Sequence, residues 1–298
     1  MSVDRTGFRK VHFFDALTGR SLGGCFQEGS LTEQNILWIL GNILLVVEAP
    51  WTVRCRGSGC VITSTNNDLA PGDYEIHSTG PLRVSDEPWV ARLRSRNVSG
   101  CESSFTTGVR LRDGRCVISG RTNNAARYCI WAAYEAAHVF PIELENMWIH
   151  NNYGRWITDI DDAVSISKIN SVQNGLLMNC SLHSLFDQYL FSIDPGDDYK
   201  IVSFMPDGFG IDGRILDPVC RDPENLDRVS DEVLRWHFMQ SVLANMRGAG
   251  EPIFEHDFPP GTDMLCAWRE EPYGKEKFEM ALVTKLKPHS GSEPESEP

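Results

Sequence analysis

The sequence predicts an α+β protein with a β-rich N-terminal domain, a central unit of strands and a helix, and a helical C-terminal segment. Short β-branched and aromatic runs, bounded by turn residues, fill the first third of the chain. The middle third combines a strand-like run with a helical pattern that carries polar side chains. A long apolar stripe with a period of four residues follows it.

Composition and charge limit the possible function classes. The 298 residues are 41% hydrophobic and 23% charged, an ordinary globular composition with enough apolar residues for a sizeable core. The formal net charge is -13, from 28 basic and 41 acidic residues. A protein that binds nucleic acid through a broad basic surface has the opposite balance. Any phosphate binding is therefore expected to be local or assisted by a metal ion.

Cysteines and hydropathy indicate the environment. Nine cysteines occur without any CxxC pair, which argues against a four-cysteine zinc site and a dense disulfide framework. The N-terminus has no secretory apolar region, and the longest apolar stretch, residues 36–47, is too short to span a bilayer. We therefore expect an intracellular protein, cytoplasmic or nuclear, with no signal peptide, transmembrane helix or membrane partner.

The first domain is expected to span residues 1–108. Its β-branched and aromatic runs predict strands over residues 10–14, 50–55, 59–63 and 74–77. The apolar stretch predicts one helix over residues 32–48. No phosphate-binding glycine loop and no nucleophile elbow occur in this part of the sequence, so an accessory role is expected.

Residues 109–221 form the second expected domain and contain the unusual polar residues. Residues 115–120 predict a short strand that ends in a turn, and His138, shortly before a proline, is predicted to lie at a strand end. Asn174 and Gly175 predict a tight turn followed by a strand. Each of these features alone is typical of ordinary structure: a core histidine, or a simple turn.

His183 and Asp187 are four residues apart, so on a helix they lie on one face. An imidazole and a carboxylate placed in this way can both reach one divalent metal ion. The same spacing is also typical of a hydrogen-bonded surface pair. The order and spacing of all these residues together favour a functional site.

The C-terminal part is expected to be a helical extension over residues 222–285, packed on the second domain, and a disordered tail over residues 286–298. Ser230 is a suitable helix cap, and acidic residues follow it in the first turn. The apolar stripe consists of residues 234, 238, 242 and 246.

The order His138, Asn174, His183, with the last two nine positions apart, resembles the HNH endonuclease family. The surrounding sequence is similar to the HNH domain of many fungal proteins over about residues 110–262. Its most similar segments are residues 116–120, 135–141, 174–177 and 183–187. The resemblance implies a ββα-metal unit, in which a hairpin and a helix surround one metal ion.

The resemblance also implies roles for single residues. His138 is the expected general base, which takes a proton from the attacking water. His183, with Asp187, is expected to hold one divalent ion, for which Mg, Mn, Ni and Zn are equally compatible. Asn174 is expected to tie the hairpin loop together and orient His138. The expected partner is nucleic acid, specifically DNA.

The sequence departs from the family pattern at two places. Many HNH domains have a metal ligand directly before the general base, where this chain has Ala137. Candidate substitute ligands are Glu135, Asp159, Asp161 and Asp162. The zinc knuckle of other HNH domains is also absent, because Cys116 and Cys180 stand alone, and both are expected to be small buried residues.

A long insert separates His138 from Asn174 and is rich in aromatic and amide side chains. Tyr153, Arg155 and Trp156 are candidates for stacking on bases or steering a phosphate. The alternative is an irregular loop that packs on the hairpin.

The leading hypothesis is a metal-dependent HNH-type endonuclease that hydrolyses phosphodiester bonds in DNA. One alternative is a protein that keeps the fold as a regulatory or protein-binding module, for which Ala137 and the acidic charge are the signs. Another is a pocket redirected to a small-molecule reaction that uses His138. The sequence gives no indication of oligomeric state.

Overall fold

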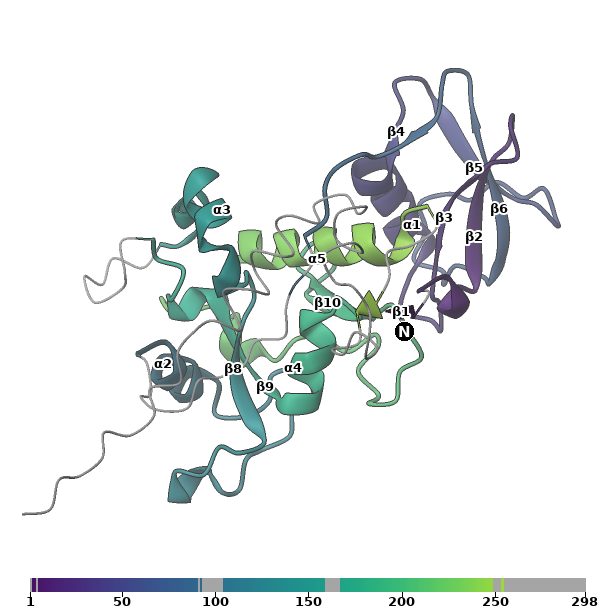
Figure 1. The fold of residues 1–298 in the computed structure, drawn as a ribbon. Helices are drawn as coiled ribbons and strands as arrows, with labels where there is room; N and C mark the ends of the chain where they lie inside the picture. The colour runs from purple at the N-terminus through teal and green to yellow at the C-terminus, as the bar shows by residue number, and fades with distance from the viewer. Residues whose placement is uncertain are drawn as a thin grey trace, which may run out of the picture. The chain divides into compact units, whose positions relative to one another are not determined.

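The computed structural model describes residues 2–3, 5–90, 92, 104–158, 167–248 and 253–254. The expected tail over 286–298, most of the extension beyond residue 248, and Asp159, Asp161 and Asp162 lie outside these ranges. The chain divides into two compact units, of which one comprises Ser2–Ile253 and contains every site discussed below. Its helices and strands are shown in Figure 1. Among the described helices, none is long and apolar enough to cross a membrane.

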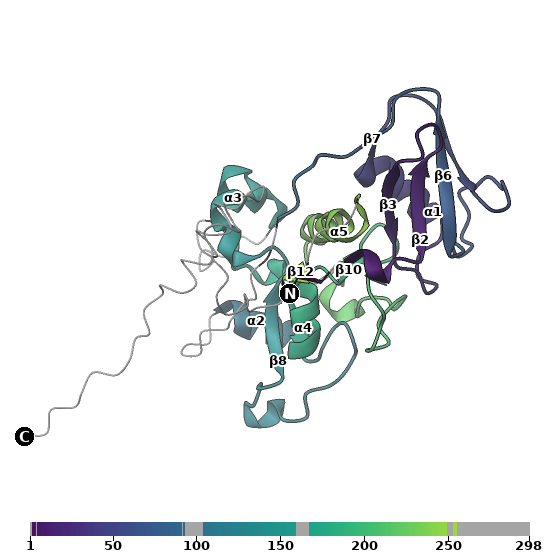
Figure 2. The same cartoon turned by 45° about the vertical axis from the view of Figure 1, so that its right-hand side comes forward.

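The N-terminal part is a four-stranded sheet in the order β3-β2-β6-β5, in which β2 and β6 are parallel and the other neighbours antiparallel. Its elements are β1 (Ser2–Val3), a 3-10 helix (Arg5–Phe8), β2 (Val11–Asp15), β3 (Ser21–Cys25), α1 (Glu33–Ile39), a π-helical turn (Leu40–Leu44), β4 (Leu45–Val46), β5 (Trp51–Cys55), β6 (Gly72–Ser78) and β7 (Arg83–Val84). Figure 2 labels β3, β2 and β6 of this sheet.

The strands predicted near residues 10–14, 50–55 and 74–77 are confirmed. The strand predicted over residues 59–63 is wrong, because this segment contributes only an isolated bridge from Val61 to Arg54. The sequence did not indicate β3, whose glycines weaken its strand pattern. Gly23 has a φ of +148°, and a Cβ there would lie 2.1 Å from the carbonyl oxygen of Met246, so close packing requires glycine.

The helix predicted over residues 32–48 is shorter and less regular than expected. Thr32 caps α1 in a reciprocal capping box with Asn35. The regular helix ends at Ile39, and the next turn is π-helical before the chain enters β4. Gly41 lies in this turn, and a Cβ there would approach the Trp51 ring to 3.1 Å.

The central part contains two antiparallel hairpins, β8–β9 and β10–β11. Its elements are α2 (Ser104–Asp113), β8 (Tyr134–His138), α3 (Glu145–His150), β9 (Gly175–Asn179), α4 (Cys180–Asp187), β10 (Phe191–Asp194), β11 (Lys200–Ser203) and 3-10 turns at Ala126–Tyr128, Ile142–Leu144, Tyr153–Trp156, Val172–Asn174 and Pro218–Cys220. The strand predicted over residues 115–120 is wrong: this segment is a turn closed by a bridge between Arg115 and Thr122.

The β8–β9 hairpin is covered by α2 on one face and α4 on the other. Ala136 and its cross-strand partner Leu177 pack with Phe105 and Val109 of α2. The opposite face includes Ala137, which lies with Leu182 and Phe186 of α4 in the largest core cluster. Because strand residues alternate between faces, Glu135 shares the α4 side with Ala137, whereas His138 lies on the α2 side.

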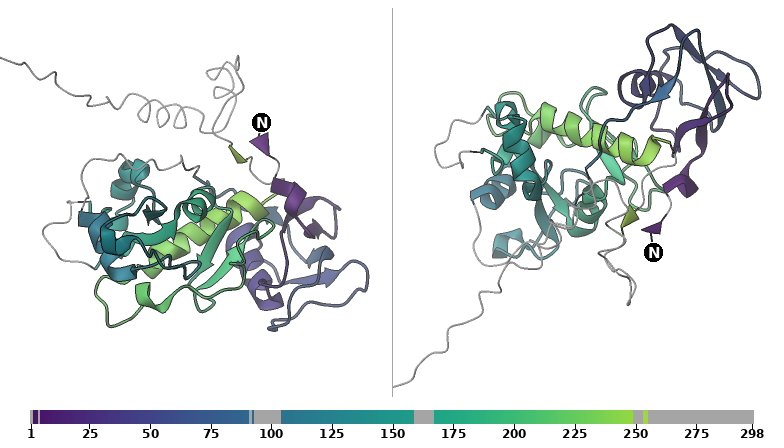
Figure 3. Two further views of the ribbon diagram at one scale, coloured as in Figure 1. Left: turned by 90° about the horizontal axis from the view of Figure 1, so that it is seen from below. Right: turned by 45° about the horizontal axis from the view of Figure 1, so that its top comes forward.

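Helix α5 (Asp231–Met246) is buried along most of its length and contacts both halves of this unit. Figure 3 shows it in light green from two directions. Leu234 packs in the central cluster, and Phe238, Val242 and Met246 pack against the N-terminal sheet. The predicted apolar stripe is therefore confirmed. The last short strand is β12 (Ile253–Phe254).

The start of α5 differs from the prediction. The helix begins at Asp231 rather than near residue 222, and the preceding segment forms turns. Ser230 stands at the N-cap position, but its hydroxyl donates to the Trp156 carbonyl oxygen at 3.0 Å instead of capping the helix. The Ser230 side chain therefore joins the start of α5 to the insert between the two hairpin strands. The mixed helix and strand content fits the predicted α+β class.

Candidate functional site

His138 is the last residue of β8, and its half-buried imidazole lies against α2. The ring of Phe105 stacks on it at a centroid distance of 3.9 Å and an angle of 9°. Its Nε2 is 3.0 Å from Oδ1 of Asn170. Gly175, the cross-strand partner of His138, makes room for this stack, because a Cβ there would lie 2.6 Å from the Phe105 ring. The imidazole is thus held on one face and at one nitrogen.

Burial favours the neutral form of this imidazole. Loss of hydration lowers the pKa of His138 to about 4, and the positive charge of Arg92 acts in the same direction. The hydrogen bond with Asn170 opposes the shift without cancelling it. His138 is therefore neutral at physiological pH, which is the form that can accept a proton.

Asn174 is completely buried at the open end of the β8–β9 hairpin. Its Oδ1 accepts from the Phe140 backbone N–H at 2.8 Å, and its Nδ2 donates to the Phe140 carbonyl at 3.0 Å. Nδ2 also donates to the Ile169 carbonyl at 2.9 Å. These bonds join the segment just after His138 to the segment just before β9. Instead of the predicted tight turn, Asn174 ends a 3-10 turn and Gly175 begins the strand.

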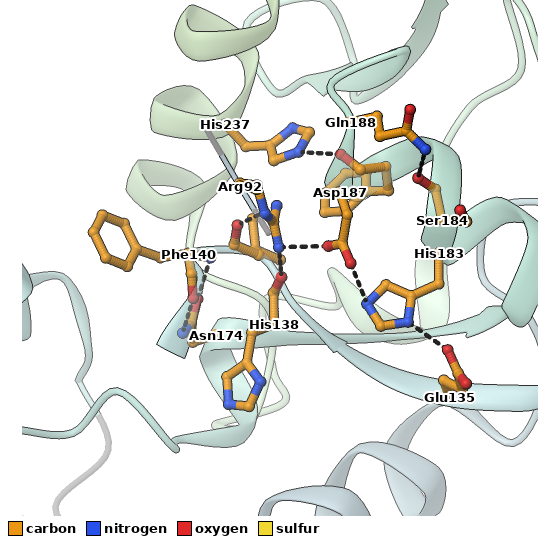
Figure 4. Close-up of polar contacts among 12 residues, drawn as sticks. Arg92, Glu135, His138, Phe140, Asn174, His183, Ser184, Asp187, Gln188 and His237 are labelled. Atoms are coloured by element: carbon orange, nitrogen blue, oxygen red, sulfur yellow. Dashed lines mark hydrogen bonds and ion pairs between the residues drawn. The ribbon is translucent and has the colours of Figure 1, made fainter. Parts of the chain in front are cut away.

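His183 and Asp187 lie one turn apart on α4, and both side chains are buried. Asn179 caps this helix by accepting from the Ser181 N–H. Nδ1 of His183 is 2.6 Å from Oε2 of Glu135, and its Nε2 is 3.4 Å from Oδ2 of Asp187 (Figure 4). Within the described residues, Nε2 has no hydrogen-bond partner of good geometry. The imidazole therefore lies between two carboxylates.

The two carboxylates determine the charge of His183. Burial alone disfavours the imidazolium, but the adjacent carboxylates of Asp187 and Glu135 outweigh it and raise the pKa of His183 to about 9. A histidine must lose its Nε2 proton before this atom can bind a metal ion. Ion binding at this pair is therefore coupled to the release of a proton at neutral pH.

Arg92 completes the site and was not indicated by the sequence. It lies far from the motif in the connector that follows β7, and its side chain is fully buried. Its Nη2 is 2.8 Å from Oδ1 of Asp187 and donates to the His138 carbonyl at 2.7 Å. Its Nη1 donates to the Val139 carbonyl at 3.1 Å. Figure 4 shows the guanidinium between the hairpin end and α4, with the His138 ring extending away from it.

The donors present fit an ion bound by two protein atoms. Nε2 of His183 and Oδ2 of Asp187 face each other, and Glu135 holds Nδ1, which is the usual arrangement of a ligand histidine and its carboxylate partner. Ala137 offers no third donor, and the described residues contain no group of three or more His, Cys, Asp or Glu side chains placed around one point. Hard divalent ions tolerate this, because water and phosphate complete their coordination.

The aromatic side chains in the described part of the insert between the hairpin strands pack on the core instead of forming an open surface. Tyr153 and Trp156 stack on each other at 4.0 Å, and both make edge contacts with the buried ring of Trp148. Phe140 joins this aromatic group through edge contacts of its own. Arg155 remains exposed. The structure thus groups Tyr153 and Trp156 with the core behind the hairpin end, which is the alternative that the sequence left open.

The cysteines fall into two groups. Cys116 is buried, as predicted. Cys180 is exposed at the start of α4, so the prediction that it is a small buried residue is wrong. All seven cysteines in the described ranges carry free thiols. The site described above uses none of them.

Comparison with known protein families gives two matches. Residues 8–83, which contain the four-stranded sheet, match a domain of unknown function (DUF8573). Residues 116–194 match the HNH endonuclease family. No curated protein and no solved structure matches the chain. The matched segment spans β8, β9, α4 and β10 and includes His138, Asn174, His183 and Asp187. The match to the HNH endonuclease family is therefore confined to residues 116–194, the hairpin-and-helix part of this chain.

Proposed function

We propose that this chain is a metal-dependent HNH-type endonuclease that hydrolyses phosphodiester bonds in DNA. The family match supports nuclease chemistry. The observation that carries the proposal is the neutral imidazole of His138 at the end of β8, in a hairpin whose other face holds the His183–Asp187 pair. An uncharged base and a pair of metal donors on one small unit suit hydrolysis of a phosphodiester by water.

His138 is the proposed general base. An amide oxygen can only accept hydrogen bonds, so the contact with Asn170 Oδ1 assigns the ring proton to Nε2. The lone pair is then on Nδ1, which takes the proton of the attacking water. Phe105 keeps the ring in one plane, and Asn174 fixes the backbone two residues further on. Both are positioning residues in this proposal.

His183 and Asp187 are the proposed ligands of one divalent ion, with Nε2 and Oδ2 as donors. When bound, such an ion stabilises the negative charge on the scissile phosphate and on the leaving oxygen. Glu135 keeps a proton on Nδ1 of His183 and thereby directs the lone pair of Nε2 toward the ion. Mg, Mn, Ni and Zn are the candidate ions for this pair.

Substrate contacts are proposed to be local, because the chain carries a net charge of -13. Of the three predicted contact residues in the insert, Arg155 is the exposed one and is the proposed phosphate contact. The rings of Tyr153 and Trp156 stack on each other, so each has one face covered. Their proposed contribution is to hold the insert in place, and only an outer ring face is left for stacking on a base.

The test is cleavage of supercoiled plasmid by the full chain with Mg2+, Mn2+, Ni2+ and Zn2+ in separate reactions. Wild type is expected to nick the plasmid with at least one ion, and excess chelator is expected to stop it. His138→Ala is expected to fold and to lose nicking. His77→Ala, an exposed histidine on β6, is the matched control and is expected to retain it.

Two results would contradict the proposal. Equal nicking by wild type and His138→Ala would show that His138 is not the base. Absence of cleavage with every ion, from a folded sample, would favour the alternative that the domain is a regulatory or protein-binding module. Cleavage of RNA but not of DNA would change the proposed substrate while keeping the proposed chemistry.

A further inference from the structure

A buried arginine connects the two halves of the proposed site. Arg92 lies outside the segment that matches the HNH family, yet its guanidinium bonds to both sides of that segment. On one side it donates to the backbone carbonyls of His138 and Val139 at 2.7 and 3.1 Å. On the other side it pairs with the carboxylate of Asp187 at 2.8 Å. The general base and a metal donor therefore share one partner.

The surroundings of the guanidinium make this contact specific. Its central carbon lies 5.5 Å from the ring centroid of Phe186 and 5.8 Å from that of Tyr189, and the side chain is 0% exposed. In such a setting a cation is stable only when acceptors satisfy it. The planar guanidinium of Arg92 presents separate N–H groups to two peptide carbonyls and a carboxylate. The compact ammonium group of a lysine, whose donors share one nitrogen, does not reproduce this geometry.

The two oxygens of the Asp187 carboxylate have different partners. Oδ1 faces Arg92, and Oδ2 faces Nε2 of His183. An ion bound at Oδ2 would therefore lie close to the positive charge of Arg92, which is paired with Oδ1 of the same carboxylate. Like charges at such short range repel each other, so the guanidinium weakens the attraction of this pair for a divalent ion. Ala137, which adds no donor, leaves this repulsion uncompensated.

We propose that Arg92 is a positioning residue of the HNH site, joining the His138 backbone to Asp187, and that its charge limits the affinity of the His183–Asp187 pair for a divalent ion. The positioning role rests on the proposed nuclease function. The effect on affinity does not, because it can be measured without any cleavage. Loss of a purely structural ion pair would not raise the affinity for the ion while lowering the cleavage rate.

The test uses two variants. Arg92→Gln removes the positive charge, and Arg92→Lys keeps the charge but lacks the planar guanidinium group. Arg235→Gln is the control, because Arg235 is exposed and pairs with Glu232 one turn away on α5. Binding of Mn2+ to each full chain is measured by calorimetry, and folding is followed by circular dichroism. Nicking of plasmid is then measured at saturating Mn2+.

Arg92→Gln is expected to bind Mn2+ roughly tenfold more tightly than wild type, because a nearby unit charge has been removed. Its nicking rate at saturating Mn2+ is expected to fall at least tenfold, because the base is no longer held. Arg92→Lys is expected to bind Mn2+ as wild type does and to nick more slowly. Arg235→Gln is expected to match wild type in both measurements.

Opposite changes in affinity and rate distinguish this proposal from a structural role, which would lower both or neither. Unchanged or weaker Mn2+ binding by Arg92→Gln overturns the effect of charge. A folded Arg92→Lys variant that nicks DNA at the wild-type rate overturns the positioning role. This variant tests that role even when Arg92→Gln does not fold. When wild type itself does not nick DNA, the proposed function fails, while the Mn2+ affinities still decide the effect of charge.

Discussion

The Phe105 ring lies flat on the His138 imidazole, with centroids 3.9 Å apart and planes inclined by only 9°. Phe105 belongs to α2, which also forms hydrogen bonds with β9, the strand opposite His138. Arg112 donates to the Gly175 carbonyl at 2.6 Å, and Asp113 accepts from the Leu177 N–H at 2.7 Å. A helix outside the matched HNH segment therefore sets the plane of the proposed base.

Gly175→Ala is expected to disturb this stack. A Cβ at Gly175 would lie 2.6 Å from both the Phe105 ring and a Val109 methyl group, so α2 must shift to accept it. Overpacking of this kind costs about 1–3 kcal/mol, and plasmid nicking should fall with it. Denaturant unfolding and nicking rates check the prediction. Gly208→Ala, at an exposed position where a Cβ meets nothing within 4 Å, should leave both unchanged.

Asn174→Ala is expected to destabilise the protein. The change leaves the Phe140 N–H and two carbonyls without their partners in a buried setting. Each such group costs about 1–3 kcal/mol, so a loss of several kcal/mol is expected in urea unfolding. Asn151→Ala removes one exposed amide bond to Met147 and should cost little. A small effect at Asn174 would mean that the hairpin end is held by other contacts.

The pKa of His138 predicts how stability depends on pH. Its folded value of about 4 lies below the unfolded value near 6.5, so between these values the unfolded chain binds more protons. This residue should therefore lower the stability as pH falls from 6.5 to 4, by roughly 1.4 kcal/mol per pH unit. His138→Gln should show a shallower decline over this range in urea unfolding. Parallel curves for the two proteins would contradict the buried neutral state.

His183 predicts the opposite pH dependence and a linked release of protons. Its folded pKa of about 9 exceeds the unfolded value, so its stabilising effect is complete below about pH 6.5 and is lost as pH rises through 9. Mn2+ must displace this proton, so affinity should fall about tenfold per pH unit from pH 9 to pH 7. Calorimetry in buffers of different ionisation enthalpy should detect about one proton released at pH 7.

Glu135→Gln tests the cause of that release. A neutral amide removes one of the two charges that favour the imidazolium, so the pKa of His183 should fall toward its ordinary value. Fewer protons should then be released when Mn2+ binds at pH 7. Identical proton release by both proteins would mean that Glu135 does not control the charge of His183.

Local patterns in the sequence were enough to predict several parts of this structure. The spacing of His183 and Asp187 predicted one helix face, and α4 places them there. The stripe through Leu234 predicted the buried length of α5, and the proline after His138 indicated a strand end. Such signals depend on residues a few positions apart, which the chain itself fixes.

The contacts that complete the site could not be predicted in the same way. Arg92 reaches Asp187 across 95 positions of chain, and Phe105 reaches His138 across 33. Neither residue lies in a recognisable motif, and each is brought to the site by tertiary packing. The strand prediction near Val61 was wrong for a related reason. This segment forms only one isolated bridge, to Arg54 at the edge of the sheet, and does not extend into a strand.

The central claim is that His138 is the general base of a nuclease, and chemical rescue tests it most directly. Single-turnover cleavage of a labelled DNA duplex is measured for wild type and for His138→Ala, with and without free imidazole. Loss of the base should slow cleavage by about 10²–10⁴-fold, and imidazole should restore part of the rate in the variant alone. Cleavage by His138→Ala at the wild-type rate would contradict the claim.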